Sequence, residues 1–398
     1  VSLERVEALG GLPLSDNGPL KHSARERQQL LTIDMHGISV SGGLQANDDG
    51  DQELELWVEN SARVSGTLDI NNAGLTETGK EQFVLTSMLY SPFKRGGAGY
   101  LNAIKTDQSN YLSISHRGPI GYRGTAFDVQ AARLHANSQN TKQQATSVSA
   151  GIRHTLIRSL ASNLFISGIF EQRLLKESPL SNRTPPLESD YKVNTLKLTL
   201  DGNRAFQKDR LTYRLETTLG DTNLNGSPNR AEDLANANTQ GRFNRLSGFL
   251  KYRKPLDDNW LFHTEFYGQY SHKNLDDSQR FIAGGAQGLR AFTKSELTVD
   301  RGALVRIDLV KQFNDIWRIG GFADWASVEK RVNNVSASNR SLEPNNQITA
   351  YNWGLTANYK MNDSLRLESS LAHAISSSDS LNTQQGDLQA LLNLNWAF

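Results

Sequence analysis

Hydrophobic and polar residues alternate along most of the chain, from near Ala62 to the last residue, Phe398. A period of two indicates β-strands. The alternating segments are about 9 to 18 residues long. Soluble strands usually have about 5–6 residues, whereas tilted membrane-spanning strands need about 9–11, so the lengths favour a membrane protein. The sixteen segments, separated by turn-rich breaks, are 62–74, 80–92, 97–108, 110–118, 124–136, 141–158, 161–177, 188–205, 210–221, 241–255, 259–273, 301–313, 317–332, 347–361, 364–377 and 385–398.

The polarity of the two strand faces separates a membrane barrel from a soluble sheet. In segment 301–313, Val305 and Ile307 lie on one face and Arg306 and Asp308 on the other. Apolar residues outside and charged residues inside are what a barrel with a wet lumen needs. A soluble β-sandwich would also alternate, but sixteen long strands without a hydrophobic-core signal favour the barrel. The last segment has an all-apolar face of Leu388, Ala390, Leu392, Leu394, Trp396 and Phe398.

Composition excludes several other classes of protein. The chain has 43 basic and 42 acidic residues, so it lacks the basic excess of a nucleic-acid-binding protein. It has no cysteine, which excludes disulfide scaffolds, cysteine-based zinc sites and thiol catalysis. No stretch approaches the roughly 18 consecutive apolar residues of a membrane-spanning helix. The first residues lack the pattern of a signal peptide, so we expect a processed chain or a fragment.

Residues 1–60 follow a different pattern. A short helical pattern begins at Leu3, and a second one covers His22–Leu31. Two strand candidates follow, at Gly37–Gln45 and Glu53–Glu59. This order predicts a small α+β unit with its boundary near residue 60, followed by the barrel over 61–398.

The sequence has no complete motif of a catalytic or cofactor site. Gly74–Lys80 has the spacing of a phosphate-binding loop, but Glu81 occupies the position of the magnesium-binding Ser or Thr. The segment precedes a strand pattern, so we interpret it as a hairpin turn. The eight histidines have no zinc-motif spacing, although a Ser/His pair assembled across strands stays open. We therefore expect no enzyme, catalytic residue, cofactor or metal.

The break at 274–300, after the eleventh strand segment, carries the most informative sequence. Three glycines in five residues allow close backbone packing or positive φ angles. Arg290 stands among apolar residues, which suggests an anchored side chain, although an ordinary flexible glycine-rich loop would also fit. The residues of interest are Phe281, Gly284, Gly285, Gly288, Leu289, Arg290 and Phe292.

This segment resembles the Phe-x-x-Gly-Gly…Val-Arg-Gly-Phe loop of two-partner secretion transporters (TpsB type) of the Omp85 superfamily. The resemblance implies a loop folded into the lumen of a sixteen-stranded antiparallel barrel. It also implies that Arg290 pairs with an Asp two strands later, where Gly321, Phe322 and Asp324 resemble the family's Gly-Phe-x-Asp-x-Gly motif. The terminal Leu394, Trp396 and Phe398 look like the C-terminal assembly signal of outer-membrane proteins.

The resemblance extends to function and partners. Residues 1–60 resemble most of a POTRA domain, without its first strand, which would lie in the periplasm and receive an unfolded exoprotein. The chain is then expected to be a monomeric secretion pore in the bacterial outer membrane, in contact with its lipid and assembled by the barrel assembly machinery. The client, an adhesin, haemolysin or contact-dependent inhibition toxin, is usually encoded beside the transporter. An insertase of the same superfamily, a passive porin and a barrel enzyme are the alternatives, in that order.

Two departures from the family pattern concern bare backbone positions. Ala291 replaces the Gly of Arg-Gly-Phe, and Ala326 replaces the Gly after the Asp. Each adds a methyl group, so we expect the loop to sit slightly differently while the Arg–Asp pair is preserved.

Overall fold

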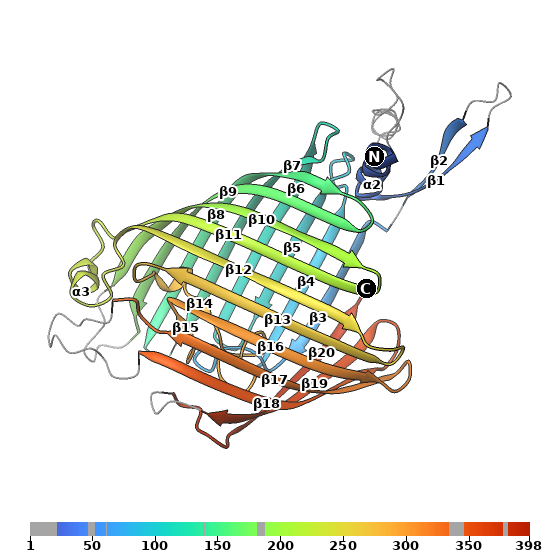
Figure 1. Ribbon diagram of the computed structural model, residues 1–398. Helices are drawn as coiled ribbons and strands as arrows, with labels where there is room; N and C mark the ends of the chain where they lie inside the picture. The colour runs from blue at the N-terminus through green and yellow to red at the C-terminus, as the bar shows by residue number, and fades with distance from the viewer. Residues whose placement is uncertain are drawn as a thin grey trace.

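The computed structural model describes residues 22–46, 52–60, 62–138, 140–180, 188–333, 346–376 and 381–398. Sixteen antiparallel strands close into one barrel (Figure 1), which confirms the fold class expected from the alternation. The barrel strands are β3 (Val64–Asn71), β4 (Gln82–Tyr90), β5 (Ala98–Lys105), β6 (Ser109–Ile120), β7 (Thr125–Asn137), β8 (Thr141–Arg158), β9 (Ser162–Pro179), β10 (Ser189–Phe206), β11 (Asp209–Asn223), β12 (Gly241–Pro255), β13 (Trp260–Ser271), β16 (Arg301–Gln312), β17 (Trp317–Glu329), β18 (Gln347–Lys360), β19 (Leu365–Ser376) and β20 (Leu388–Ala397).

The remaining described elements are short. They are α2 (His22–Ile33), β1 (Ile38–Ala46), β2 (Gln52–Asn60), α3 (Arg230–Ala235), the 3-10 helix η2 (Asp277–Gln279), β14 (Phe281–Ile282) and β15 (Thr298–Val299). Within the described ranges, none of these helices is long and apolar enough to cross a membrane.

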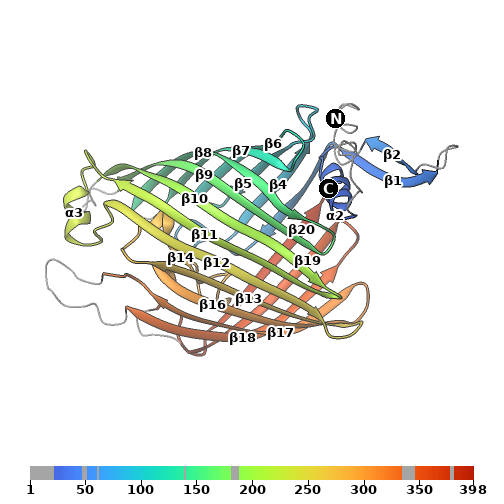
Figure 2. The same ribbon diagram turned by 45° about the horizontal axis from the view of Figure 1, so that its top comes forward.

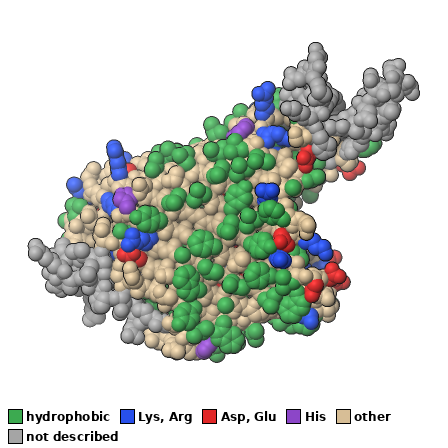
Figure 3. All heavy atoms as spheres, in the orientation of Figure 1, with side chains coloured by type: hydrophobic (Ala, Val, Ile, Leu, Met, Phe, Trp, Pro, Cys, Tyr) green, Lys and Arg blue, Asp and Glu red, His purple; other side chains and the backbone are tan. Residues whose placement is uncertain are grey.

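The faces of the strands follow the expected alternation. Along β20, Leu388, Leu392 and Trp396 are exposed on the outside, whereas Leu391 is buried on the inside. Hydrophobic side chains cover much of the visible outer wall (Figure 3). Closure leaves no unpaired strand edge, which a sheet in lipid requires because no water is present to satisfy free backbone groups.

The two ends of the barrel differ in their connections. Tight turns lie at the end that also carries α2 and the C-terminus, and α3 lies at the opposite end (Figure 1). Asp257 and Asn314 each accept backbone N–H bonds from residues two and three positions later, and so fix tight turns. Gly74–Lys80 is a hairpin connection between β3 and β4, as its sequence context indicated.

The described N-terminal elements match their sequence predictions. Helix α2 covers the predicted His22–Leu31, and β1 and β2 form an antiparallel pair at the predicted strands. The helical pattern from Leu3 lies outside the described residues. Whether these elements belong to a POTRA domain stays a prediction.

Helix α2 and the residues that follow it dock on the barrel rim near the turns between β4 and β9 (Figure 2). The guanidinium of Arg158 makes two bonds of 2.7 Å to the carboxylate of Asp34, just after the helix. Arg27 donates to the carbonyl of Thr155 at 2.6 Å, and Glu26 accepts from the N–H of Leu160 at 2.9 Å. These bonds fix the helix against the barrel.

The ring closes where β20 pairs with β3. Their register runs from Asn393–Asn71 to Ala397–Thr67 and is short. Side chains extend it: Asn72 donates to the carbonyl of Ala390 at 2.9 Å, and its amide oxygen accepts from the N–H of Leu392 at 2.9 Å. We call this closing pair the seam.

Candidate functional site: a loop held inside the barrel

The connection between β13 and β16 turns into the barrel. Figure 1 places its short strands, β14 and β15, within the barrel outline, where they pair with each other. Ala286 and Lys294 line a cavity of about 450 Å³ together with inward residues of β3, β4, β18, β19 and β20. We call residues 272–300 the lumenal loop and residues 284–294 its tip.

Three glycines allow the tip to fold onto itself. A Cβ on Gly284 would lie 2.2 Å from the carbonyl oxygen of Thr293, and one on Gly288 would lie 2.1 Å from that of Ala283. Gly285 has a φ of +87°, where side chains are strained. Each glycine therefore meets a specific backbone requirement, which a flexible glycine-rich loop would not need.

Arg290 projects from the tip to two carboxylates on the barrel wall. Its Nε and Nη2 donate to the two oxygens of Asp324 on β17, at 2.9 and 2.6 Å. Its Nη1 donates to Asp308 on β16 at 2.7 Å. Asp324 is completely buried and the Arg290 side chain nearly so. Bidentate, charge-assisted bonds of this kind are among the strongest in proteins, and they fix orientation as well as distance.

Other groups complete the surroundings of this pair. Asn352 on β18 donates to Asp324 at 2.8 Å, and its amide oxygen accepts from the N–H of Ala291 at 3.3 Å. The guanidinium of Arg290 also stacks 3.5 Å from the centre of the Phe322 ring, and Arg306 lies 3.7 Å from Asp324. Burial alone would lower the pKa of Arg290, but Asp324 and Asp308 outweigh it and raise that pKa, so the charge is secured.

An apolar cluster surrounds the tip and neighbouring residues of the lumenal loop. Ala291 and Ala326 both lie within it and are nearly or fully buried, so the lumen accommodates the two methyl groups that replace family glycines. The cluster contains Ala283, Leu289, Ala291, Phe292, Leu297 and Val299 of the loop, with Leu304, Phe322, Ala326, Val328, Ile348, Ala350, Ala372, Ala374 and Leu381 facing them.

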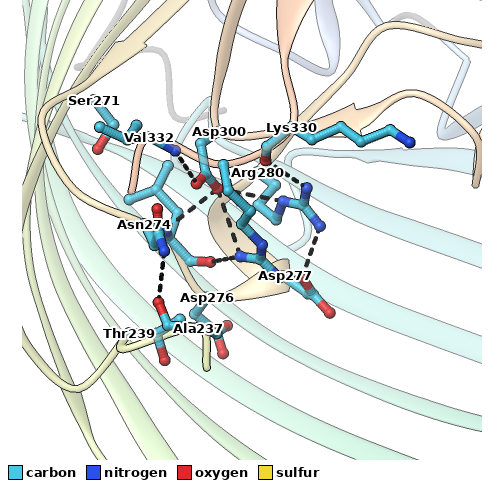
Figure 4. A network of polar contacts seen from close by, with 12 residues as sticks. Ala237, Thr239, Ser271, Asn274, Asp276, Asp277, Arg280, Asp300, Lys330 and Val332 are labelled. Carbon is cyan, nitrogen blue, oxygen red and sulfur yellow. Dashed lines mark hydrogen bonds and ion pairs between the residues drawn. The ribbon is translucent and has the colours of Figure 1, made fainter. Parts of the chain in front are cut away.

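A second polar centre lies at the neck of the lumenal loop, which we define as residues 274–280 together with Asp300 (Figure 4). Asp300 is completely buried and lies 3.3 Å from Nε of Arg280 and 3.7 Å from Nη1 of Arg331. Its oxygens accept the N–H groups of Leu275 and Val332, each at 3.2 Å. Burial raises the pKa of Asp300, although Arg331 and Arg280 act in the opposite direction.

The predicted site residues lie in two places: around the lumenal loop, and at the end of β20. The structure brings Arg290, Phe322 and Asp324 together, with Phe281 packed against the apolar cluster. Gly321 is not part of this contact, since a Cβ there would meet only the Gly354 carbonyl oxygen, at 3.8 Å. The predicted terminal signal, Leu394, Trp396 and Phe398, lies in β20 and directly after it, where Phe398 exchanges two backbone bonds of 3.0 Å with Gly66.

Sequence reasoning missed several groups that contact the loop. Asp308 had been recognised as inward-facing, but not as a partner of Arg290. The strand register could have found Asn352, because it lies opposite Asp324 in the β17–β18 pair. The same holds for Gly354, which leaves room for the ring of Phe322. Asp300 stands in a break without periodicity, and nothing in the sequence marked it.

Several solved structures have a similar fold. CdiB from Escherichia coli superposes with a TM-score of 0.76 at 15% identity, covering 98% of this chain and 74% of that chain. CdiB from Acinetobacter baumannii gives 0.74 at 15% identity, covering 100% and 72%. BamA from Haemophilus ducreyi lacking POTRA domains 1–3 gives 0.63 at 12% identity, covering 94% and 77%. Identities this low establish similarity of fold alone.

Sequence similarity covers a smaller part of the chain than the structural similarity does, but it identifies the family. The heme/hemopexin transporter protein HuxB of Haemophilus influenzae (strain 86-028NP) is 24% identical over 295 residues, 71% of this chain and 51% of that protein. The chain thus spans about half the length of the curated relatives it matches. The family model for haemolysin secretion/activation proteins ShlB/FhaC/HecB matches residues 50–330, well over half of the chain. The chain therefore belongs to the ShlB/FhaC/HecB family of haemolysin secretion/activation proteins, bacterial outer-membrane β-barrels of the two-partner secretion type.

Proposed function

We propose that the chain is an outer-membrane translocation pore that secretes a large unfolded exoprotein by two-partner secretion. The observation that carries this proposal is the lumenal loop, bound to the inner wall through Arg290 and Asp324 in a barrel of the secretion family. A passive porin needs no such loop with a buried carboxylate partner. The passenger is an adhesin, a haemolysin or a contact-dependent inhibition toxin.

Residues 1–60 serve, in this proposal, as a periplasmic POTRA-like domain that receives the passenger. Among the described residues, the sheet of β1 and β2 has no third strand, so an extended chain could add to its edges by backbone hydrogen bonds. The bonds from Arg158 to Asp34 and from Arg27 to the barrel rim support a position of this domain beside the periplasmic mouth. The passenger then crosses the barrel and folds outside, which would supply direction without a nucleotide.

Assembly and oligomeric state complete the proposal. The outward aromatic rings of Trp396 and Phe398, 5.4 Å apart at the end of β20, would be read by the barrel assembly machinery. The closed ring satisfies the barrel strands without a partner chain, which supports a monomer in contact with outer-membrane lipid.

Insertion of membrane proteins is the second candidate, because BamA shares the fold. An insertase of this architecture would need the seam to open toward lipid. The asparagine bonds across the seam and its closed register favour a passenger that stays in the lumen.

A locked seam tests the two functions against each other. The chain has no cysteine, so cysteines at the register partners Thr67 and Ala397 would form the only disulfide. A matched control places cysteines at Thr86 and Asn102, partners in the β4–β5 pair away from the seam. The readout is secretion of the exoprotein encoded beside the chain's gene, under oxidising and reducing conditions.

We expect the oxidised seam variant to secrete as well as its control, because the passenger would not leave through the wall. Secretion that stops only when the seam is oxidised, and returns on reduction, would overturn the lumenal route. No secretion of the exoprotein by the parent protein in its native host would overturn the secretion function itself.

A further inference from the structure

The centre around Asp300 lies apart from the contacts of Arg290. It joins the two ends of the lumenal loop, since Asp300 precedes β16 while Leu275 and Arg280 follow β13. Figure 4 shows Arg280 pointing between Asp300 and the carbonyl of Lys330, to which it donates at 2.8 Å. The neck is therefore closed by one buried carboxylate.

The same carboxylate ties the neck to another connection. Arg331, two residues after the end of β17, donates to the carbonyl of Leu275 at 3.0 Å and faces Asp300. Asn274 adds a second bridge: its amide nitrogen donates to the carbonyls of Ala237 and Asn333, at 2.7 and 3.0 Å. At the barrel end opposite α2, the neck is thus bonded to the β11–β12 connection and to residues 331–333 after β17.

Charge balance makes Asp300 the critical member of this centre. Arg280 and Arg331 both face it, and its other acidic neighbour, Asp277, is largely exposed at 77%. Without the Asp300 carboxylate, two cations would face each other across a partly buried neck with only a solvated partner. Uncompensated charge of this kind strongly favours rearrangement.

We propose that Asp300 is a positioning residue that clamps the neck of the lumenal loop to residues 330–333 after β17, and thereby keeps the tip against the β16–β18 wall. It acts through Arg290, which alone reaches the wall carboxylates from the tip. The inference rests on the proposed function, in which the exoprotein crosses the barrel that holds this loop. It adds a second attachment point at the mouth opposite α2.

The test is single-channel conductance of the full chain in planar bilayers, which needs no passenger. Asp300→Asn keeps the shape of the side chain and removes its charge, and Asp277→Asn is the matched control at the exposed edge of the same centre. Arg331→Gln combined with Asp300→Asn removes one of the two unbalanced cations. Heat-modifiable migration on gels verifies that each barrel is closed.

We expect Asp300→Asn to raise the frequency of large openings roughly tenfold, equivalent to about 1.4 kcal/mol, and Asp277→Asn to change it less than about twofold. Arg331→Gln should reverse at least half of the effect. In an Arg290→Ala background, where the tip is already free, Asp300→Asn should add little, whereas a merely structural role would leave the two effects additive.

The proposal is overturned if Asp300→Asn matches Asp277→Asn, or if its effect is additive with Arg290→Ala. Should Asp300→Asn fail to form a closed barrel, Asn274→Ala opens the same neck without burying charge. Wild-type openings in that variant would then refute the clamp. Because conductance is measured without a passenger, absent secretion would count against the proposed function and leave this test intact.

Discussion

Arg290→Ala removes the contact between the tip and the wall at its strongest point. The substitution deletes bonds to Asp324 and Asp308 and leaves a completely buried carboxylate behind. Breaking a buried pair from one side typically costs about 3–5 kcal/mol. Asp324 keeps its bond from Asn352 and has Arg306 at 3.7 Å, so we take the lower end, about 3 kcal/mol.

An energy of about 3 kcal/mol corresponds to a change of about 150-fold in an equilibrium constant, at about 1.36 kcal/mol per factor of ten. Displacement of the tip should therefore become about a hundred times more frequent. The assay is the rate of large conductance steps in planar bilayers, recorded for the parent and for Arg290→Ala. Arg117→Ala is the control, because Arg117 also faces the lumen but pairs with Asp128 at a more exposed position, 41% for the arginine side chain.

Equal step rates for Arg290→Ala and the parent would refute the reasoning, as would an equal rise in Arg117→Ala. The first result would mean that the ion pair does not hold the tip. The second would mean that any loss of lumenal charge alters the pore. Arg290→Lys should fall between parent and alanine variant, because an ammonium group cannot make the bidentate contact.

Three further predictions test other parts of the structure. Gly288→Ala should impair secretion in a barrel that still closes, since its Cβ would lie 2.1 Å from the Ala283 carbonyl oxygen. Gly321→Ala is the control and should secrete normally, because its Cβ would lie 3.8 Å from the nearest atom. Equal secretion by both variants would contradict the tip geometry. Arg158→Ala should loosen α2 from the rim, so that limited proteolysis near Asp34 becomes several-fold faster while conductance is unchanged; an unaltered cleavage rate would contradict this. Phe398→Ala should slow assembly, because it removes the outward ring that lies over Gly66. Assembly is measured as the heat-modifiable fraction in outer-membrane preparations. Phe313→Ala, which removes another exposed outward aromatic ring, is the control and should assemble at the parental rate.

The barrel could be predicted because alternation is a local property of each strand. Sixteen segments were placed within about three residues of the observed strand ends, and their apolar faces were assigned correctly along β16 and β20. The contact between Arg290 and Asp324 was different: its residues are 34 positions apart, and only the family motif linked them. Physical reasoning from the residues alone left the loop undecided between an anchored and a flexible form.

What escaped prediction depends on the relative shift of strands and on irregular backbone. Asp308 and Asn352 join the contacts of the tip because β16, β17 and β18 pair in one particular register, which alternation does not specify. Asp300 lies outside the periodic segments, and Arg331 lies at the end of segment 317–332, beyond the last residue of β17, so their meeting depends on the path of two connections. A Cβ on Gly321 would meet only the Gly354 carbonyl oxygen, at 3.8 Å, so the structure gives no steric reason for this glycine of the motif.

The apolar cluster around the tip opposes removal of the loop from the lumen. Leu289, Phe292 and Leu297 are completely buried against small inward residues of β17–β19, among them Ala350 and Ala372. Wetting these three side chains would cost about 5–9 kcal/mol, taking about 1.5–3 kcal/mol for each. A loop drawn out of the lumen would expose apolar residues of the wall to water. Burial of that surface would favour the return of the loop. Apolar burial thus favours the loop inside the lumen, independently of the charges that set its orientation.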